Sequence, residues 1–356
     1  MVSQLKWHHF LERGTCMKAL FIGGTGTISL SISEQLLDLG WDVYILNRGH
    51  RKHDLSGENL HLIHGDINDE EQIAELIKDL AFDVVCDFIA FVPEHVQRDF
   101  RLFANKTKQY MFISSASAYQ TPLSDFRITE GTPLSNPNWK YSRDKIACEE
   151  YLMKQYRDAG FPITIIRPSH TYDQRSIPLG VHGKMGGWPV VQRILDGKEV
   201  IIHGDGTSLW TMTHSRDFAK GFIGLMANIH AIGEAVQITS DESLTWNQIY
   251  QAIADACNMP LKAIHVASEF LAETSDYDFR GGLLGDKANS VVFDNRKLKR
   301  LVPEFVATTR FDQGIRECIE YHLSYTEFQK EDQEFDDWCD QVIEAISQAK
   351  NSLNKE

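Results

Sequence analysis

Short apolar runs alternate with amphipathic stripes of helical spacing along the first half of the chain, and this alternation restricts the fold most. The expected strands cover 18–23, 42–46, 60–64, 82–88, 109–114 and 162–167. Helices are expected between them, over 27–39, 73–80 and 94–104 and around Tyr141. Because parallel strands are joined by right-handed helical crossovers, the pattern predicts an α/β fold with a Rossmann-type doubly wound parallel sheet.

After Arg167 the alternation loosens and glycine-rich loops appear. Thr245 is expected to cap a helix whose apolar stripe falls within 246–253. The last helix shows a second apolar stripe within 335–346, which we interpret as a face packed on the core.

A glycine-rich turn, GGTGTIS at 23–29, lies where the first expected strand meets its helix. Glycine permits the tight turn and lets backbone N–H groups approach a pyrophosphate at the helix N-terminus. Ser29 stands where this fingerprint usually has its third glycine. The turn predicts a nicotinamide dinucleotide cofactor. The expected cofactor contacts are Gly23, Thr25, Gly26, Thr27, Ile28, Asn47, Arg48, Arg51, Asp66, Ile67, Ala90, Ser114, Lys145 and Pro168.

The end of the second expected strand decides between NAD and NADP. NAD-selective sites usually have an acidic residue there, whereas this chain has the stretch NRGHRK at 47–52. Arg48 and Arg51 can hold a 2′-phosphate in bidentate fashion, and a solvated basic loop is the alternative. We predict NADP, with NAD as second choice. Asp66, after the third strand, is suitably placed to bond the adenine amino group.

Tyr141 and Lys145 are four residues apart in YSRDK, and SSASAY at 114–119 precedes them. Tyrosine has a free pKa of about 10, too high for a base at neutral pH. A lysine one helical turn away lies on the same face, and its charge favours the phenolate. Tyr141 is therefore the expected general acid/base for an alcohol–carbonyl interconversion, with Ser115 bonding the same substrate oxygen.

The chain resembles the extended short-chain dehydrogenase/reductases, often labelled the NAD-dependent epimerase/dehydratase family. The resemblance runs from Met17 to about His322 and includes GGTGTIS, HGDIND, SSASAY, YSRDK, IIRPSHTYD, IIHGDGTSLWTMTHSRDFA and LLGDKANSVVFDNRKLKRLVP. It implies that Ser115, Tyr141 and Lys145 are catalytic and that Lys145 also bonds the nicotinamide ribose. It further implies a smaller C-terminal substrate-binding lobe and a homodimer.

We accordingly expect three parts of the chain. Residues 1–16 are a flexible extension or an upstream start, and 17–168 form the NAD(P)-binding Rossmann domain. Residues 169–356 form mainly the substrate-binding lobe, with some segments returning to the Rossmann sheet and a helix at the end.

Two departures from the family's patterns bear on the reaction. Dehydratases of this family carry an Asp-Glu pair directly after the catalytic Ser or Thr, where this chain has Ala116 and Ser117. Sugar-nucleotide epimerases carry an asparagine and two arginines for the nucleotide diphosphate, where this chain has His170, Trp210 and Leu283. We rank dehydration low and expect a sugar-like or other small hydroxylated substrate without a UDP-like handle.

The residues expected to contact this small-molecule substrate are Ser117, His170, Lys184 and Trp210. Trp210 can stack on a sugar face or pack in the core, and both readings stay open. The histidines near the expected pocket have no metal-binding spacing, so no metal is expected.

The leading hypothesis is an NAD(P)-dependent oxidoreductase or epimerase that works through a keto intermediate. One alternative is a nucleotide-sugar epimerase or 4-keto reductase with an atypical diphosphate site. The other is a non-enzymatic sensor or RNA-associated relative, because chloroplast RNA-binding members of this fold resemble the chain in the loop at 47–49.

Composition limits the partners and the cellular location that we expect for the protein. A net charge of −14 on 356 residues lacks the basic footprint of a general nucleic-acid binder, so no nucleic-acid partner is expected. Six cysteines without CxxC spacing predict reduced, mostly buried thiols. The first 16 residues lack the apolar stretch of a signal peptide, and no run is long enough to span a bilayer. We expect a cytoplasmic protein with no membrane partner.

Overall fold

The computed structural model describes residues 16–50 and 54–353. These residues form two compact units. The first, called the sheet unit here, comprises the described residues up to Ser114 together with 147–167 and 219–236. The second unit comprises 115–146, 168–218 and the described residues from Gln237 onward.

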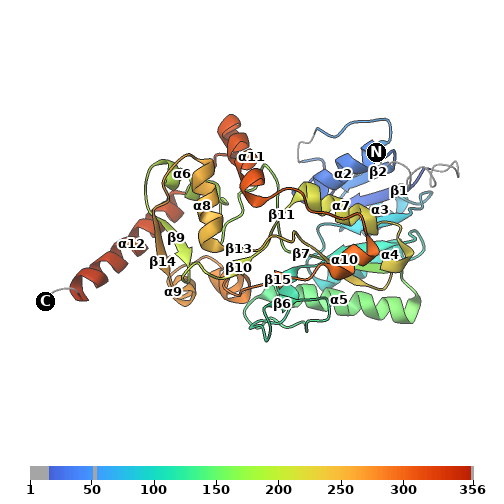
Figure 1. The fold of residues 1–356 in the computed structure, drawn as a ribbon. Helices are drawn as coiled ribbons and strands as arrows, with labels where there is room; N and C mark the ends of the chain where they lie inside the picture. Colours follow the sequence, from blue (N-terminus) through green and yellow to red (C-terminus); the bar gives the residue numbers. More distant parts are fainter. Residues whose placement is uncertain (1–15, 51–53, 354–356) are drawn as a thin grey trace. The chain divides into compact units, whose positions relative to one another are not determined.

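A seven-stranded sheet organises the sheet unit (Figure 1). Its order is β3-β2-β1-β4-β5-β7-β12, and the pairs from β3 through β7 are all parallel. The strands are β1 (Lys18–Ile22), β2 (Asp42–Asn47), β3 (Leu60–His64), β4 (Val84–Asp87), β5 (Tyr110–Ile113), β7 (Ile163–Pro168) and β12 (Ala235–Ile238). This order is that of a doubly wound Rossmann sheet, which confirms the predicted fold class.

Helices connect the strands, and all except the last of the five overlap helices that the sequence predicts. They are α2 (Ser29–Asp38), α3 (Glu70–Leu76), α4 (Pro93–Phe103), α5 (Lys140–Ala159) and α7 (Ser215–Leu225). Asp69 begins α3 by accepting a hydrogen bond from the Gln72 amide at 3.1 Å, and α4 begins with a proline, which already has the helical φ. Their apolar stripes bury Ile32, Ile73, Val96 and other side chains on the sheet.

The second unit is built from short strands and seven helical segments in the described residues. Its strands are β6 (Arg127–Ile128), β8 (His170–Tyr172), β9 (Val200–His203), β10 (Leu209–Trp210), β11 (Met212–His214), β13 (Leu244–Thr245), β14 (Ala263–Val266) and β15 (Val292–Phe293). They pair only in twos: β6 with β15, β8 with β11, β9 with β14 and β10 with β13.

The helical segments hold these strand pairs around one core. They are α6 (Trp188–Leu195), α8 (Trp246–Ala256), α9 (Ser268–Glu273), the π-helix η3 (Arg280–Lys287), α10 (Arg296–Leu301), α11 (Phe311–Ser324) and α12 (Gln333–Leu353). Single 3-10 turns lie at η1 (Ala116–Ala118), η2 (Ile229–Ala231, in the sheet unit) and η4 (Thr326–Phe328).

Two expectations about these helices are confirmed. Thr245 caps α8 with a reciprocal capping box to Gln248. The apolar face of α12 packs on the core through Phe335, Cys339 and Val342.

All six cysteines are free thiols, and four of them are buried, as the sequence predicts. In the described residues no helix is long and apolar enough to cross a membrane. The cytoplasmic location stays a prediction.

Candidate active site and dinucleotide pocket

The glycine-rich turn follows β1 and leads into α2. Gly23 and Gly24 have φ values of +100° and +70°, a region that side chains with a Cβ rarely adopt. A Cβ on Gly24 would lie 2.8 Å from Cγ2 of Ile45, which is closer than real contacts allow. The turn therefore needs glycine both for its backbone conformation and for its close approach to β2.

Ser29 replaces the third glycine of the fingerprint and takes part in the turn itself. Its hydroxyl accepts a hydrogen bond from the Gly26 amide at 2.8 Å. Ser33, one helical turn later, donates to the Gly24 carbonyl at 3.0 Å. The serine at this position thus fixes the turn by side-chain bonds.

A cavity of about 500 Å³ opens at this turn, within the size range of small-molecule and cofactor sites. The predicted cofactor residues that line it are Gly23, Thr25, Gly26, Asn47, Arg48, Asp66 and Ile67. Its wall also includes Leu46, Gly49, His50, Asn68, Phe88 and Ile89, which the sequence did not single out. The residues present fit a dinucleotide, because glycines open the phosphate end and polar side chains follow β2 and β3.

The remaining predicted cofactor residues lie elsewhere. Thr27 and Ile28 do not line this cavity, and Ala90 is buried in the core of the sheet unit. Arg51 lies outside the described residues. Lys145 and Pro168 belong to the second unit.

Ser114 is also absent from the lining of this cavity. Its buried hydroxyl donates to Oε1 of Glu149 at 2.5 Å, and Nη2 of Arg167 donates to Oε2 of Glu149 at 2.6 Å. These bonds join the end of β5 to α5 and β7, so the side chain of Ser114 has a structural partner.

A buried ion cluster that the sequence analysis missed supports the dinucleotide cavity. Arg98 of α4, which is 4% exposed, donates to Oδ2 of Asp87 and Oδ1 of Asp99 at 2.8 Å each. It also donates to Oδ1 of Asn68 at 2.9 Å, and the Ile89 amide donates to Oδ1 of Asp87 at 2.6 Å. Desolvation raises the pKa of the Asp87 carboxyl, which the nearby Asp99 reinforces and the guanidinium opposes. Because Asn68 and Ile89 line the cavity, this cluster fixes its wall.

A second cavity, of about 230 Å³, brings Ser115 and Tyr141 together and is called the Tyr141 pocket here. Helix α5 begins at Lys140, so Tyr141 lies in its first turn and Lys145 one turn later. The Lys145 side chain is 2% exposed, and its Nζ lies 5.7 Å from the centre of the Tyr141 ring. A buried ammonium thus lies beside the tyrosine ring, one helical turn along α5.

Three serine hydroxyls form a chain beside Tyr141. Ser142 donates to Oγ of Ser117 at 2.7 Å, and Ser117 exchanges a 2.8 Å hydrogen bond with Oγ of Ser115. The Ser117 amide also donates to Oγ of Ser115 at 3.1 Å. Ser117 stands where dehydratases of the family have a carboxylate, so this pocket presents a hydroxyl network there.

Asn136 holds this hydroxyl network against other parts of the second unit. It is 2% exposed, and its amide NH₂ donates to the carbonyl oxygens of Ser117 at 2.9 Å and Gly285 at 2.6 Å. Its Oδ1 accepts from the amides of Asn138 and Trp139 at 3.1 Å each, just before α5. One side chain thus joins the serine loop, the start of the tyrosine helix and the π-helix.

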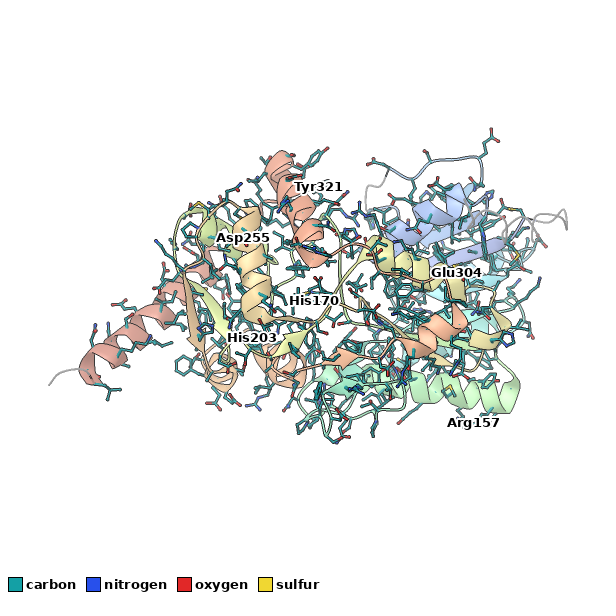
Figure 2. The ribbon with its side chains drawn as sticks, in the orientation of Figure 1. Arg157, His170, His203, Asp255, Glu304 and Tyr321 are labelled. Carbon is teal, nitrogen blue, oxygen red and sulfur yellow. The ribbon has the colours of Figure 1, made fainter. Side chains whose placement is uncertain are left out.

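Of the predicted substrate residues, Ser117, His170 and Trp210 line the Tyr141 pocket. His170, labelled in Figure 2, lies at the start of β8, and burial holds the pKa of its imidazole well below the usual range. Trp210 is 4% exposed and lies 5.9 Å from Trp246, ring centre to ring centre. It is therefore both a core residue and part of the pocket wall.

Lys184 is not brought to this pocket. Its Nζ lies 3.2 Å from Oε2 of Glu334 and 5.8 Å from the ring centre of Tyr277. The sequence suggested it as one of the cations that could replace the missing diphosphate-binding arginines, a signal that says nothing about where its side chain lies.

The pocket has further lining residues that the sequence analysis did not assign to the substrate. They are Ala116, Trp139, Pro168, Ser169, Asp286 and Lys287. Asp286 and Lys287 end the π-helix, and their charged atoms lie 3.2 Å apart. A π-helix has no simple sequence signature, so the placing of these two charged side chains in one pocket was seen only in the folded chain.

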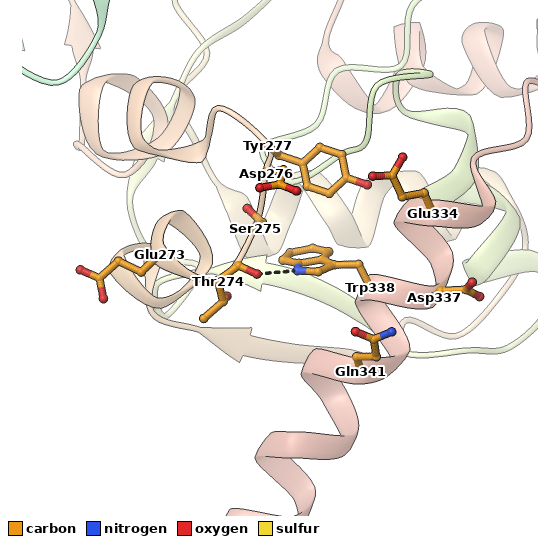
Figure 3. A pocket seen from close by; sticks show the side chains of 9 residues that line it. All are labelled: Glu273, Thr274, Ser275, Asp276, Tyr277, Glu334, Asp337, Trp338 and Gln341. Carbon is orange, nitrogen blue, oxygen red and sulfur yellow. Dashed lines mark hydrogen bonds between the residues drawn. The ribbon is translucent and has the colours of Figure 1, made fainter.

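A larger hollow of about 560 Å³ lies beside α12 (Figure 3). It is lined by acidic side chains and by Tyr277 and Trp338, whose indole N–H donates to the Thr274 carbonyl at 3.3 Å. Its lysine neighbour, Lys184, is exposed and pairs with Glu334, whereas the Tyr141 pocket joins its tyrosine to a buried lysine and to a chain of serine hydroxyls, so the smaller Tyr141 pocket is the better candidate for catalysis. Within the described ranges there is no group of three or more histidine, cysteine or acidic side chains suited to a metal ion.

The comparisons with known proteins agree with this architecture. The 2′-dehydrokanamycin reductase of Streptomyces kanamyceticus is 23% identical over 299 residues, which cover 81% of this chain and 80% of that protein. The chloroplast stem-loop binding protein of 41 kDa b of Arabidopsis thaliana is 25% identical over 272 residues, covering 73% of this chain and 68% of that protein.

Among solved structures, UDP-glucuronic acid 4-epimerase from Bacillus cereus, in complex with UDP-glucuronic acid and NAD, matches with a TM-score of 0.69. That match has 19% identity and covers 87% of this chain and all of that one (100%), so it shows the fold alone. The model of the NAD dependent epimerase/dehydratase family matches residues 19–239. This chain therefore belongs to the NAD dependent epimerase/dehydratase family.

Proposed function

We propose that the protein is an NAD(P)-dependent oxidoreductase or epimerase that acts through a keto intermediate on a sugar-like hydroxylated substrate. The observation that carries this proposal is the meeting of Ser115 and Tyr141 in one pocket, with the buried Lys145 ammonium 5.7 Å from the tyrosine ring. The likeness to a 2′-dehydrokanamycin reductase, whose name describes a ketone on an aminoglycoside, supports the reaction class.

A bound nicotinamide supplies the hydride acceptor or donor, and the side chains of the pocket handle the proton. Tyr141 takes the proton of the substrate hydroxyl through its phenolic oxygen while the carbon gives up its hydride and the C=O bond forms. In the other direction the same oxygen returns a proton to the carbonyl. Lys145 favours the phenolate, and Ser115 bonds the substrate oxygen, with its own orientation set by Ser117.

The test is Tyr141→Phe, which keeps the ring and removes only the hydroxyl. It should retain cofactor binding and lower kcat by at least about a hundredfold, the typical contribution of a general acid/base. Tyr151→Phe is the matched control, because it makes the same change on the same helix away from the pocket lining. Unchanged turnover in Tyr141→Phe would remove this tyrosine from the mechanism.

Binding of NADP in preference to NAD is part of the proposal. Asn47 stands at the end of β2, where an acidic side chain would favour NAD, and its Oδ1 accepts from the Gly49 amide at 2.7 Å. Exposed Arg48 lines the same cavity and can pair with a 2′-phosphate. Against this preference, the similar Bacillus cereus epimerase was solved in complex with NAD.

Titration of the purified protein with both nucleotides decides between them. NADP should bind more tightly, and Arg48→Ala should weaken NADP while leaving NAD unchanged. Arg157→Ala, an exposed arginine labelled in Figure 2 near the end of α5, is the control. Equal or tighter binding of NAD by the unaltered protein would overturn the preference.

Epimerase and reductase use the same side chains here, so retention of the cofactor separates them. Native mass spectrometry of the freshly purified protein should show a bound nucleotide if the cofactor is recycled within one turnover. An empty protein that binds added NADPH indicates a reductase or dehydrogenase.

A non-enzymatic, RNA-associated function is the second candidate, because of the likeness to the chloroplast stem-loop binding protein. The net charge of −14 and the presence of Ser115 and Tyr141 in one pocket favour the enzyme. Failure of both nucleotides to bind at millimolar concentration, together with retention of a stem-loop RNA, would reverse this ranking.

The protein is also proposed to be a homodimer, on the family resemblance. Light scattering on the eluting protein tests this directly, since a dimer has twice the chain mass of 40.6 kDa.

A further inference from the structure

The π-helix η3 delivers two opposite charges to the Tyr141 pocket. Side-chain Nζ of Lys287 lies 3.2 Å from Oδ2 of Asp286, and the two side chains are 13% and 14% exposed. A carboxylate only accepts hydrogen bonds and an ammonium only donates them, whereas a hydroxyl group does both. The pair is therefore complementary to a ligand with neighbouring hydroxyl groups, since one hydroxyl can donate to Asp286 while the next accepts from Lys287.

The position of this pair is fixed by the surrounding core. The backbone carbonyl of Lys287 accepts from the Trp246 indole at 3.0 Å and from the Ser208 hydroxyl at 3.3 Å, and Nε2 of His203 lies 3.2 Å away. Asn136 holds the preceding turn through the Gly285 carbonyl at 2.6 Å. π-Helices are rare, and many of them lie at functional sites. The end of this one is held in place by the hydrogen bonds just described.

The charge balance of the pocket disfavours phosphate. Among the described residues that line it, Asp286 is the one carboxylate, Lys287 is the one lysine and no arginine is present. Diphosphates are held in proteins by charge-assisted bonds, most strongly from arginine. Here the ammonium already has an anionic partner, and that partner would repel a phosphate.

Two polar atoms of the pocket wall have no hydrogen-bond partner among the described residues. They are Nε1 of Trp210 and Nδ1 of His170, and both atoms are buried. A buried polar atom without a partner costs free energy, and a substrate hydroxyl would remove that cost after a small shift of the covering side chains.

We propose that the Tyr141 pocket binds a pyranose ring that carries no phosphate, with Asp286 and Lys287 reading its hydroxyl groups and Trp210 and His170 completing the contact. The cavity of about 230 Å³ is small and has room for one sugar ring. Trp139 and Trp210 offer apolar surface to the faces of the ring. The ring is a free sugar or the terminal residue of a glycoside. This inference rests on the proposed function and specifies its substrate.

Binding rather than turnover is the test, so that the inference and the proposed function can fail separately. Saturation-transfer NMR on the full chain, with bound NADP, compares neutral free hexoses, their methyl pyranosides, UDP-glucose and dTDP-glucose. At least one neutral pyranose should bind, and no nucleotide sugar should bind more tightly than the matching methyl pyranoside. Methyl pyranosides that bind better than free hexoses identify a glycoside as the source of the ring.

Asp286→Asn tests the hydroxyl-reading pair with an isosteric change. Loss of a charge-assisted hydrogen bond should weaken the pyranose by about 10- to 100-fold without changing NADP affinity. Asp276→Asn, an exposed residue shortly before the π-helix, should have no effect. A nucleotide sugar that outcompetes every pyranoside, no pyranose binding up to tens of millimolar, or unchanged binding in Asp286→Asn would each overturn the inference. Intact NADP binding and an inactive Tyr141→Phe would leave the proposed function standing in all three cases.

Trp210→Phe keeps an aromatic ring but removes the unpaired N–H together with part of the indole. It should weaken the pyranose by several-fold and lower the thermal midpoint less than Trp246→Phe does, because both changes remove buried volume but this one loses no hydrogen bond of the described chain. Trp246→Phe is the matched control, since its N–H donates to Lys287 and its loss should lower the midpoint. A Trp210→Phe protein that binds the pyranose normally would exclude the indole from recognition.

Discussion

Asn136→Asp is the sharpest test of how the Tyr141 pocket is assembled. The change keeps Oδ1, which accepts from the amides ahead of α5, and replaces the NH₂ that donates to Ser117 and Gly285 by an oxygen. Each buried carbonyl left without its donor costs about 1–3 kcal/mol, so the folded protein should lose about 2–6 kcal/mol of stability. Asn136 is 2% exposed, so water cannot replace the missing donor without local opening.

The pH dependence of this variant gives an internal check. Burial beside two carbonyl oxygens should raise the pKa of the new carboxyl above its unfolded value of about 4. With a raised pKa the folded protein binds this proton more tightly than the unfolded chain does, and the protonated carboxyl can donate one hydrogen bond. Stability therefore decreases as the pH rises through the folded-state pKa. The stability lost relative to the unaltered protein should therefore be smaller at pH 5 than at pH 8.

Chemical denaturation at both pH values, followed by intrinsic tryptophan fluorescence, measures this difference. Asn138→Asp is the matched control, because its side-chain NH₂ reaches the Leu284 carbonyl only at 3.5 Å. An Asn136→Asp protein as stable as the original at pH 8, or a control equally destabilised, would refute the assignment of Asn136 as the residue that joins the three segments.

Three further perturbations test other parts of the structure. Gly24→Ala should weaken nucleotide binding and lower stability by more than Gly40→Ala, because both have positive φ but only Gly24 has a neighbour at 2.8 Å; titration with NADP and thermal melts compare them. Arg98→Met should cost about 3–5 kcal/mol, since it leaves buried carboxylates without their cation, whereas Arg101→Met on the same helix removes an exposed pair and should cost at most about 1 kcal/mol; equal melting temperatures would contradict the buried-ion account. Burial lowers the pKa of His203 to about 4, so between about pH 6.5 and 4 the unfolded chain binds a proton that the folded protein does not. The free energy of unfolding should therefore fall by at most about 3 kcal/mol over this range. In denaturation curves His203→Gln should remove part of that fall, and the other buried histidines should account for the rest.

Local patterns in the sequence predicted six of the seven strands of the sheet and placed Tyr141 and Lys145 on one helix face, whereas β12 was not predicted. The alternation of apolar runs with helical stripes reports backbone periods of two and 3.6 residues, which hold wherever the segment lies in the fold. The glycine-rich turn is recognisable because only glycine tolerates the φ values found at Gly23 and Gly24. A lysine four residues after a tyrosine lies on the same helix face by geometry alone.

Contacts between distant segments were decided by tertiary packing. Asp286 and Lys287 follow Tyr141 by 145 and 146 residues, and no local period relates them to it. Asn136 itself looks like an ordinary turn residue until its four hydrogen bonds are seen. Ser114 was expected at the cofactor, yet its hydroxyl is bonded to Glu149, because a helix packed beside β5 supplies a buried carboxylate.

The residues predicted to contact the substrate show the same division. His170 and Trp210 replace residues at recognisable motif positions and line the Tyr141 pocket, whereas Lys184 was suggested by its charge alone and does not line it. Side-chain chemistry and local conformation follow from the sequence read along the chain. Which side chains share a pocket depends on how strands and helices pack, because packing is set by complementary surfaces from segments far apart in the sequence.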